Sequence, residues 1–267
     1  MGVSILMVGS EALPMSKTGG LADVLGALPL ALGRLGHRVT LVTPKYRTAQ
    51  AHGSSVTIRV PFGGSQETRA IEQPLAEGVR AVLIDRPEFY DRASIYGDGG
   101  DYPDNPRRFG FLCRAALEYA IQRPETFDVL HAHDWQAGLA PVYLRTRYAG
   151  EPRISSMGTV FTIHNLAYQG SFAPDWLPAL DLPPELMSME GLEFWGQVSF
   201  LKGGINFSQV ITTVSPTYAR EIQSTEYGAG LEGVLAARAG DLHGVLNGID
   251  TDQWDPSRDP YLPEPYD

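Results

Sequence analysis

Ile5-Leu6-Met7-Val8 opens the stretch that decides the fold, because these four apolar residues show no alternation with polar ones. Such a run is typical of a parallel strand that is buried on both faces. A turn containing Ser16-Lys17-Thr18-Gly19-Gly20 follows, and then a helical stretch from Leu21 to Leu35, which Gly36 ends. A second buried strand, Val39 to Val42, completes the unit. The stretch therefore predicts a parallel α/β fold with right-handed crossovers.

The same alternation continues outward along the chain. Further strands are expected at Val56 to Val60, Val79 to Ile84, Val129 to Ala132, Val160 to Ile163 and Val210 to Val214, with Phe62-Gly63-Gly64-Ser65 as the turn that joins the first two. Helices are expected at Asn105 to Ile121, Gln136 to Arg147, a stretch that ends near Phe207, and Pro216 to Gln223. An insertion rich in proline and aromatic residues spans Pro174 to Trp195.

Composition narrows the class of protein. With 43% hydrophobic residues the chain can bury a core, and its net charge of −10 argues against a nucleic-acid partner. The single cysteine, Cys113, excludes an internal disulfide and fits a reducing compartment. No signal peptide is recognisable at the start, and no run approaches the ~20 apolar residues of a membrane span. We therefore expect a cytoplasmic protein without a membrane partner.

The turn before the first helix is the first candidate for chemistry. In doubly wound sheets, ligands bind beyond the carboxyl ends of the strands, where this turn lies. Gly19 and Gly20 let backbone N–H groups approach an oxyanion, while the helix N-terminus and Lys17 add positive charge. The residue order matches neither a Walker loop nor G-x-G-x-x-G. A phosphate site and a tight turn with a solvated lysine both remain open at this point.

Two histidines mark the end of another predicted strand, in His131-Ala132-His133-Asp134-Trp135. His131 and His133 share one face if the strand continues. Because H-x-H can begin a metal site, a metal-dependent hydrolase is one interpretation. The remaining histidines form no second closely spaced pair, so histidines that are hydrogen-bonded at the end of the sheet are favoured over metal ligands.

Two more polar motifs follow strands. Thr162-Ile163-His164-Asn165-Leu166-Ala167-Tyr168 combines hydrogen-bonding groups with an aromatic ring, which suits a sugar, although an asparagine turn would also explain it. Asn247-Gly248 predicts a turn. We expect all four motifs to lie on one face of the sheet, because the carboxyl ends of parallel strands share an edge.

The opening motif, Lys17 to Pro29, resembles the donor loop of bacterial glycogen synthases and plant starch synthases. Blocks that resemble the same family follow in the same order at His131 to Ala140, Phe161 to Gly170, Gly191 to Lys202, Thr213 to Glu221 and Gly244 to Asp250. The resemblance covers nearly the whole chain. It implies an α/β fold with a Rossmann-like doubly wound parallel sheet, as one half of a two-domain GT-B glycosyltransferase.

The resemblance also implies an activity and partners. It implies retaining transfer of glucose from ADP-glucose to the non-reducing end of an α-1,4-glucan, either glycogen or a maltooligosaccharide, without a metal or cofactor. Residues 1–254 would form the N-terminal, acceptor-side catalytic domain, and 255–267 the start of a linker. The linker would lead to a C-terminal nucleotide-binding domain that is absent from this chain. A glucan-binding module without turnover is the alternative.

Each candidate site residue takes a role from this resemblance. Lys17, Gly19 and Gly20 would hold the donor diphosphate. Asp134 and His164 would bond hydroxyls of the transferred glucose, so Lys17, Asp134 and His164 form the predicted catalytic set. The remaining expected substrate-binding residues are Asn165 and Asn247 in the sugar pocket, Glu11 and Asp23 beside the loop, and Tyr102, Trp135 and Tyr168 as stacking surfaces for the glucan.

Overall fold

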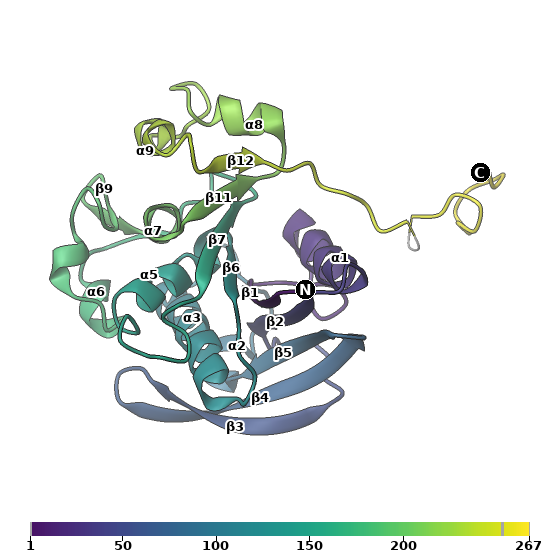
Figure 1. Cartoon of the computed structure of the whole chain (residues 1–267), viewed down its shortest axis with the longest axis horizontal. Helices are drawn as coiled ribbons and strands as arrows, with labels where there is room; N and C mark the ends of the chain where they lie inside the picture. The colour runs from purple at the N-terminus through teal and green to yellow at the C-terminus, as the bar shows by residue number, and fades with distance from the viewer. Residues whose placement is uncertain (1, 252–253, 267) are drawn as a thin grey trace.

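The computed structural model describes residues 2–251 and 254–266, and its centre is one large twisted sheet (Figure 1). The strand order within these residues is β12-β11-β7-β6-β1-β2-β5-β4-β3. All pairs from β12 to β5 are parallel, whereas β4 pairs antiparallel with both β5 and β3. The strands are β1 (Ser4–Val8), β2 (Arg38–Pro44), β3 (Ser54–Pro61), β4 (Ser65–Ala76), β5 (Val79–Asp85), β6 (Val129–His133), β7 (Gly158–Ile163), β11 (Val210–Thr213) and β12 (Leu242–Gly244).

Helices cover both faces of the sheet, as Figure 1 shows, so the predicted α/β class with a doubly wound sheet is confirmed. Residues of β1 alternate between two cores: Leu6 and Val8 pack in the larger core with α3, while Ile5 and Met7 pack in the smaller core with α1. The helices are α1 (Gly20–Arg34), α2 (Pro87–Tyr90), α3 (Asn105–Gln122), α4 (Asp134–Ala137), α5 (Leu139–Arg145), α6 (Trp176–Ala179), α7 (Phe200–Phe207), α8 (Pro216–Glu221) and α9 (Glu232–Ala237), with a 3₁₀ turn at Pro184–Leu186.

The strand order reverses at β1. From β1 the chain adds β2 and β5 on one side, and β6, β7, β11 and β12 on the other. Crossovers therefore leave β1 and β6 in opposite directions, which opens a crevice at the carboxyl ends of these strands. In doubly wound folds ligands bind in such a crevice, so the candidate site is expected there.

The structure corrects two expectations about elements. Phe62-Gly63-Gly64-Ser65 joins β3 to β4, not β3 to β5, because the twelve-residue strand β4 intervenes. Its many polar residues and Pro74 conceal it in the sequence, and they are tolerated because one face of β4 is exposed. The helix expected over Gln136 to Arg147 is two helices, α4 and α5, divided at Gly138, which lies against the backbone carbonyl of Phe200 in α7.

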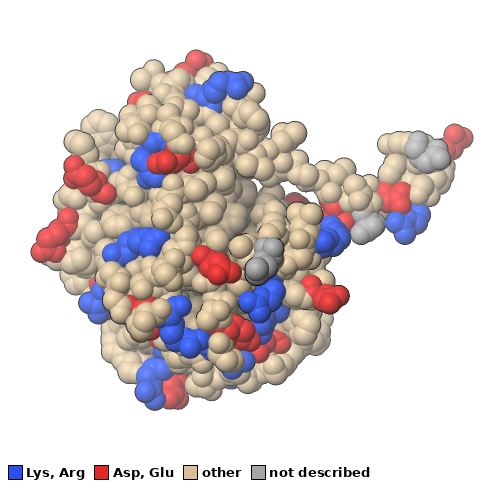
Figure 2. Space-filling model, viewed as in Figure 1, with Lys and Arg blue, Asp and Glu red and all other residues tan. Residues whose placement is uncertain are grey.

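A small antiparallel sheet flanks the insertion expected at Pro174 to Trp195, and only its strand β9 (Glu193–Phe194) lies within those bounds. Its other strands are β8 (Ser171–Phe172) and β10 (Gln197–Ser199), with β10 in the centre. After β12 the chain runs away from the body, as Figure 1 shows. Figure 2 shows acidic and basic side chains interspersed on the face in view. No helix among the described residues is long and apolar enough to cross a membrane.

Candidate active site

A cleft of about 750 Å³ lies where the carboxyl ends of five neighbouring strands meet. Each strand is followed by a residue that lines it: Glu11 after β1, Asp134 after β6, His164 after β7, Val214 after β11 and Asn247 after β12. The four motifs that the sequence singled out therefore converge on one site, as expected.

Nine of the predicted site residues line this cleft and three do not. The structure brings together Glu11, Gly19, Gly20, Asp134, Trp135, His164, Asn165, Tyr168 and Asn247. Lys17, Asp23 and Tyr102 lie outside the lining.

Glu11 organises the loop that precedes α1. Its buried carboxylate accepts hydrogen bonds from the backbone N–H of Thr18, from the Thr18 hydroxyl at 3.0 Å, and from the N–H of Gly19 at 3.3 Å. Lys17 Nζ lies 2.6 Å from Asp23 Oδ1, and both side chains are nearly half exposed. In this conformation the N–H groups of Thr18 and Gly19 and the Lys17 ammonium group are therefore engaged by carboxylates of the chain itself.

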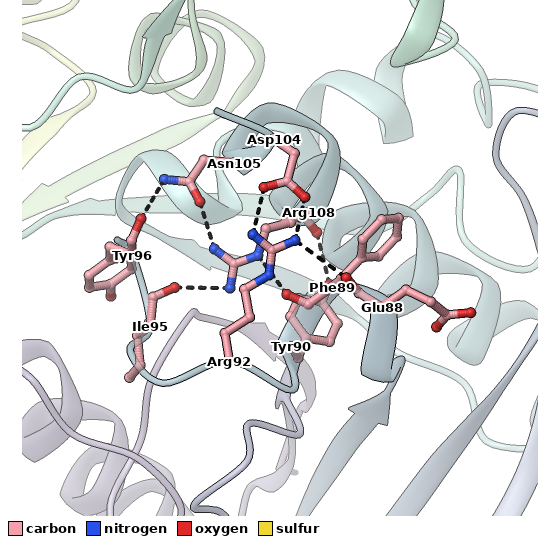
Figure 3. A network of polar contacts seen from close by, with 9 residues as sticks. All are labelled: Glu88, Phe89, Tyr90, Arg92, Ile95, Tyr96, Asp104, Asn105 and Arg108. Atoms are coloured by element: carbon pink, nitrogen blue, oxygen red, sulfur yellow. Dashed lines mark hydrogen bonds and ion pairs between the residues drawn. The ribbon is translucent and has the colours of Figure 1, made fainter. Parts of the chain in front are cut away.

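A buried arginine fixes the segment between α2 and α3 (Figure 3). The Arg108 guanidinium donates to the carbonyl oxygens of Phe89 at 2.7 Å and Ile95 at 2.9 Å, and to Asn105 Oδ1 at 2.6 Å. Asn105 Nδ2 in turn donates to the Tyr96 carbonyl at 2.9 Å. Burying a charged guanidinium group costs free energy unless its N–H groups are hydrogen-bonded, and Arg108 is fully buried. These hydrogen bonds therefore hold the segment in place.

The fixed segment presents Tyr96 to the cleft and keeps Tyr102 away from it. The Tyr96 hydroxyl donates to Glu11 Oε1 at 3.1 Å, which links Arg108 indirectly to the loop before α1. The Tyr102 ring instead packs under the guanidinium groups of Arg92, at 4.7 Å, and of Arg108, at 5.1 Å. Tyr96, which the sequence did not single out, therefore lines the cleft, whereas Tyr102 does not.

Asp134 turns sharply out of β6 with a positive φ of 56°. Its Oδ1 accepts the backbone N–H of His164 at 2.8 Å, which ties the ends of β6 and β7 together. Burial raises the pKa of the Asp134 carboxyl to about 7; the N–H groups of His164 and Asn165 oppose this shift, and the Glu11 carboxylate adds to it. Asp134 can therefore be protonated or charged near neutral pH.

Three histidines form a contiguous group, of which His164 lines the cleft. The rings of His131 and His133 lie 4.1 Å apart on one face of β6, as predicted, and His133 Nδ1 lies 2.9 Å from His164 Nε2. His131 Nε2 contacts Thr162 Oγ1 at 2.7 Å. Burial lowers the pKa of His131 to about 3 and that of His164 to about 4, so both are neutral near pH 7. Within the described residues, no three His, Cys, Asp or Glu side chains are grouped so that they could hold a metal ion.

The two aromatic residues of the cleft differ in exposure. Trp135 is only 8% exposed and packs against Phe109 at 5.0 Å and Phe172 at 5.6 Å between ring centroids. Gly170, at φ 57°, lies against the indole, so that no side chain fits there. Tyr168 is 66% exposed and offers a free ring. Trp135 therefore supports the wall of the cleft, while Tyr168 is available for stacking.

The sequence missed other residues of the lining. They are Thr18, Leu21, Val24, Tyr96, Asp101, Gln136, Ala167, Gln169, Gly170, Ser171, Phe172 and Val214. Thr18 and Ala167 lie inside the quoted motifs without an assigned role, and Gln136 and Gln169 directly follow two of these motifs. Tyr96 and Asp101 lie in an irregular loop whose position no periodicity indicates.

The sequence of this chain is similar to the sequences of proteins from one known family. A family model for the starch synthase catalytic domain matches residues 4–237. The chain is 47% identical over 268 residues to a glycogen synthase of Anaeromyxobacter dehalogenans, and 45% identical over 263 residues to glycogen synthase 2 of Geobacter sulfurreducens. These matches cover 98% and 96% of the chain, but 55% and 54% of the relatives. The chain thus spans about half the length of the curated relatives it matches.

A solved structure of a starch synthase is similar to this chain in both fold and sequence. The catalytic domain of starch synthase IV from Arabidopsis thaliana, bound to ADP and acarbose, is similar over 100% of this chain and 56% of its own, with a TM-score of 0.90 and 33% identity. The fold, the order of the motifs and the family model agree. The chain belongs to the starch synthase catalytic domain family.

Proposed function

We propose that this chain forms the acceptor-side part of an enzyme that transfers glucose from ADP-glucose to the non-reducing end of an α-1,4-glucan, with retention at the anomeric carbon. The observation that carries the proposal is the cleft, which sets sugar-binding groups, Asp134 and His164, beside a glycine-containing loop at a helix N-terminus. Family membership and the relative bound to ADP and acarbose support it.

The donor diphosphate would bind at the loop that contains Lys17, Gly19 and Gly20. Because Glu11 engages the N–H of Gly19 and Asp23 engages Lys17, the anion would exchange places with carboxylates that already occupy these donors. Carboxylates at a helix N-terminus imitate the charge of the phosphate oxygens. Binding of the donor would therefore require these internal contacts of Glu11 and Asp23 to be released.

Transfer would depend mainly on charge stabilisation and orientation. The phosphate leaves as the glucan hydroxyl attacks from the same face, through an oxocarbenium-like state, while Lys17 and backbone N–H groups stabilise the departing charge. Asp134 and His164 would orient the glucose through its hydroxyls, Asn165 and Asn247 would line its pocket, and Tyr168 would contact the glucan. Neutral His164 can donate one hydrogen bond and accept another.

We further propose that residues 1–254 constitute this domain and that 255–267 begin a connection to a nucleotide-binding domain of the same enzyme, which would complete the GT-B cleft. The curated relatives, of which this chain matches about half, support this division. A buried free thiol, Cys113, is in keeping with action in the cytoplasm.

The test is incorporation of labelled glucose into glycogen by the enzyme that contains this chain, with ADP-glucose and UDP-glucose as parallel donors. Incorporation from ADP-glucose with retained α-linkage is the expected result. Retardation of the enzyme by glycogen in native electrophoresis, without incorporation from either donor, would replace the proposal by the glucan-binding module.

A further inference from the structure

The turn of the β9–β10 hairpin holds a tryptophan in an unfavourable backbone conformation. Phe194 pairs with Gln197, so Trp195 and Gly196 form a two-residue turn, with φ values of 51° and 76°. Turns with two positive φ values favour Asn-Gly, because asparagine tolerates the left-handed region and bulky residues do not. A tryptophan at the first position therefore costs conformational free energy.

Burial does not offset this cost, since Trp195 is 82% exposed. Its ring meets Phe194 edge to face at a centroid distance of 6.3 Å, and its indole nitrogen lies near Gly230. A side chain that is both exposed and strained contributes little to folding, and such outliers point to a functional role.

The hairpin belongs to the same small sheet as a wall of the cleft. Gly170, Ser171 and Phe172, in and before β8, line the cleft, and β8 and β9 flank the central strand β10. Gln169 Nε2 donates to the Ala229 carbonyl at 2.9 Å, and the next residue, Gly230, lies against Phe194 and Trp195. The surface thus continues from Tyr168 at the cleft to Trp195 through a polar contact.

We propose that Trp195 binds an α-glucan chain outside the cleft, with its indole stacked on the apolar face of a glucose unit. This rests on the proposed function, which makes a glucan the acceptor. Single rings separated by hydrogen-bonding groups suit a chain of sugar units, each with an apolar face and a hydroxylated rim. A long acceptor would then be held at the cleft and again at the hairpin, which raises its effective concentration at the site.

The experiment compares Trp195→Asn, Trp195→Tyr and Trp254→Asn with the wild type. Trp254 is also an exposed tryptophan but lies in the segment after β12, so it is the matched control. Dissociation constants are measured with glycogen, by retardation in native electrophoresis, and with maltotriose, whose three glucose units gain least from a second binding place. Melting temperatures show whether each variant folds.

Trp195→Asn should weaken glycogen binding about 3- to 10-fold, as expected for the loss of one stacked aromatic ring. Maltotriose binding should stay unchanged, and the melting temperature should not fall, because Asn-Gly suits the turn. Trp195→Tyr should retain glycogen binding within about twofold, since a ring remains. Trp254→Asn should behave as the wild type.

If glycogen retards Trp195→Asn as strongly as it retards the wild type, this inference is overturned, while the proposed transfer of glucose stands. A fall in mass by sedimentation in Trp195→Asn, with glycogen binding intact, would assign the ring to a contact between copies of the chain and would also overturn it. If the wild type neither binds glycogen nor incorporates glucose, the proposed function fails as well.

Discussion

At the scale of single residues, the role proposed for Lys17 requires this side chain to exchange Asp23 for the donor diphosphate. Its ion pair with Asp23 is nearly half exposed on both sides and contributes little to stability. In the complete enzyme, Lys17→Ala should lower turnover roughly 10²–10³-fold, because one preorganised contact to the departing charge is lost. Glycogen retardation and melting temperature should barely change. A loss of turnover below about threefold would show that Lys17 is not part of the site.

The buried histidines and Asp134 make stability depend on pH in opposite directions. The lowered pKa values of His131, His133 and His164 mean that the unfolded chain takes up protons that the folded chain does not. Their contribution is present above about pH 6.5 and is lost as pH falls toward 4. The raised pKa of Asp134 contributes stability at low pH that is lost as pH rises from about 4 to about 7.

The three histidines together change the free energy of unfolding more than the single Asp134 carboxyl does. The free energy of unfolding should therefore fall when pH is lowered from 7 to 5. In Asp134→Asn the opposing contribution disappears, and the fall should be steeper by up to about 1.4 kcal/mol per pH unit. Urea titrations at pH 7, 6 and 5 measure both quantities. A wild-type free energy of unfolding that stays constant or increases as the pH is lowered from 7 to 5 would contradict the assignment of neutral buried histidines.

At the scale of elements, α7 packs closely on β7 because glycine lies at the contact. A Cβ on Gly204 would come within 2.4 Å of the Phe161 ring, whereas a Cβ on Gly233 in α9 would meet nothing within 4 Å. Gly204→Ala should therefore destabilise the fold by about 1–3 kcal/mol through overpacking. Gly233→Ala, its matched control, should stabilise it by about 0.5–1 kcal/mol. Equal effects in chemical denaturation would show that α7 is not held this closely.

At the scale of the whole molecule, a polypeptide of these 267 residues should fold but not transfer glucose. It has two cores around one sheet, so its thermal unfolding should be cooperative. On the proposed function, the departing ADP would need more positive charge than Lys17 and a few N–H groups provide, and each missing donor would be worth about 3 kcal/mol in the transition state. Labelled-glucose incorporation beside an unfolding curve is the measurement. Turnover near that of complete synthases would contradict the division of the site between two domains.

The sequence by itself determined the alternation of strands and helices, the parallel part of the sheet and the strand ends that line the cleft. Local apolar runs are sufficient for this, because a strand buried on both faces needs them. The loop before α1 and the residues after β6, β7 and β12 could therefore be located from local pattern alone. Strand β4 was not predicted, because its exposed face carries polar residues and therefore shows no continuous apolar run.

Only the tertiary structure decided which side chains meet. Tyr96 lines the cleft and Tyr102 does not, because the buried Arg108 of α3 fixes the irregular loop that carries both residues. The tertiary structure also placed Lys17 on Asp23 and turned the loop N–H groups toward Glu11. Contacts between residues far apart in the chain carry no local periodicity, so their geometry follows from how the elements pack rather than from the residues that compose each one.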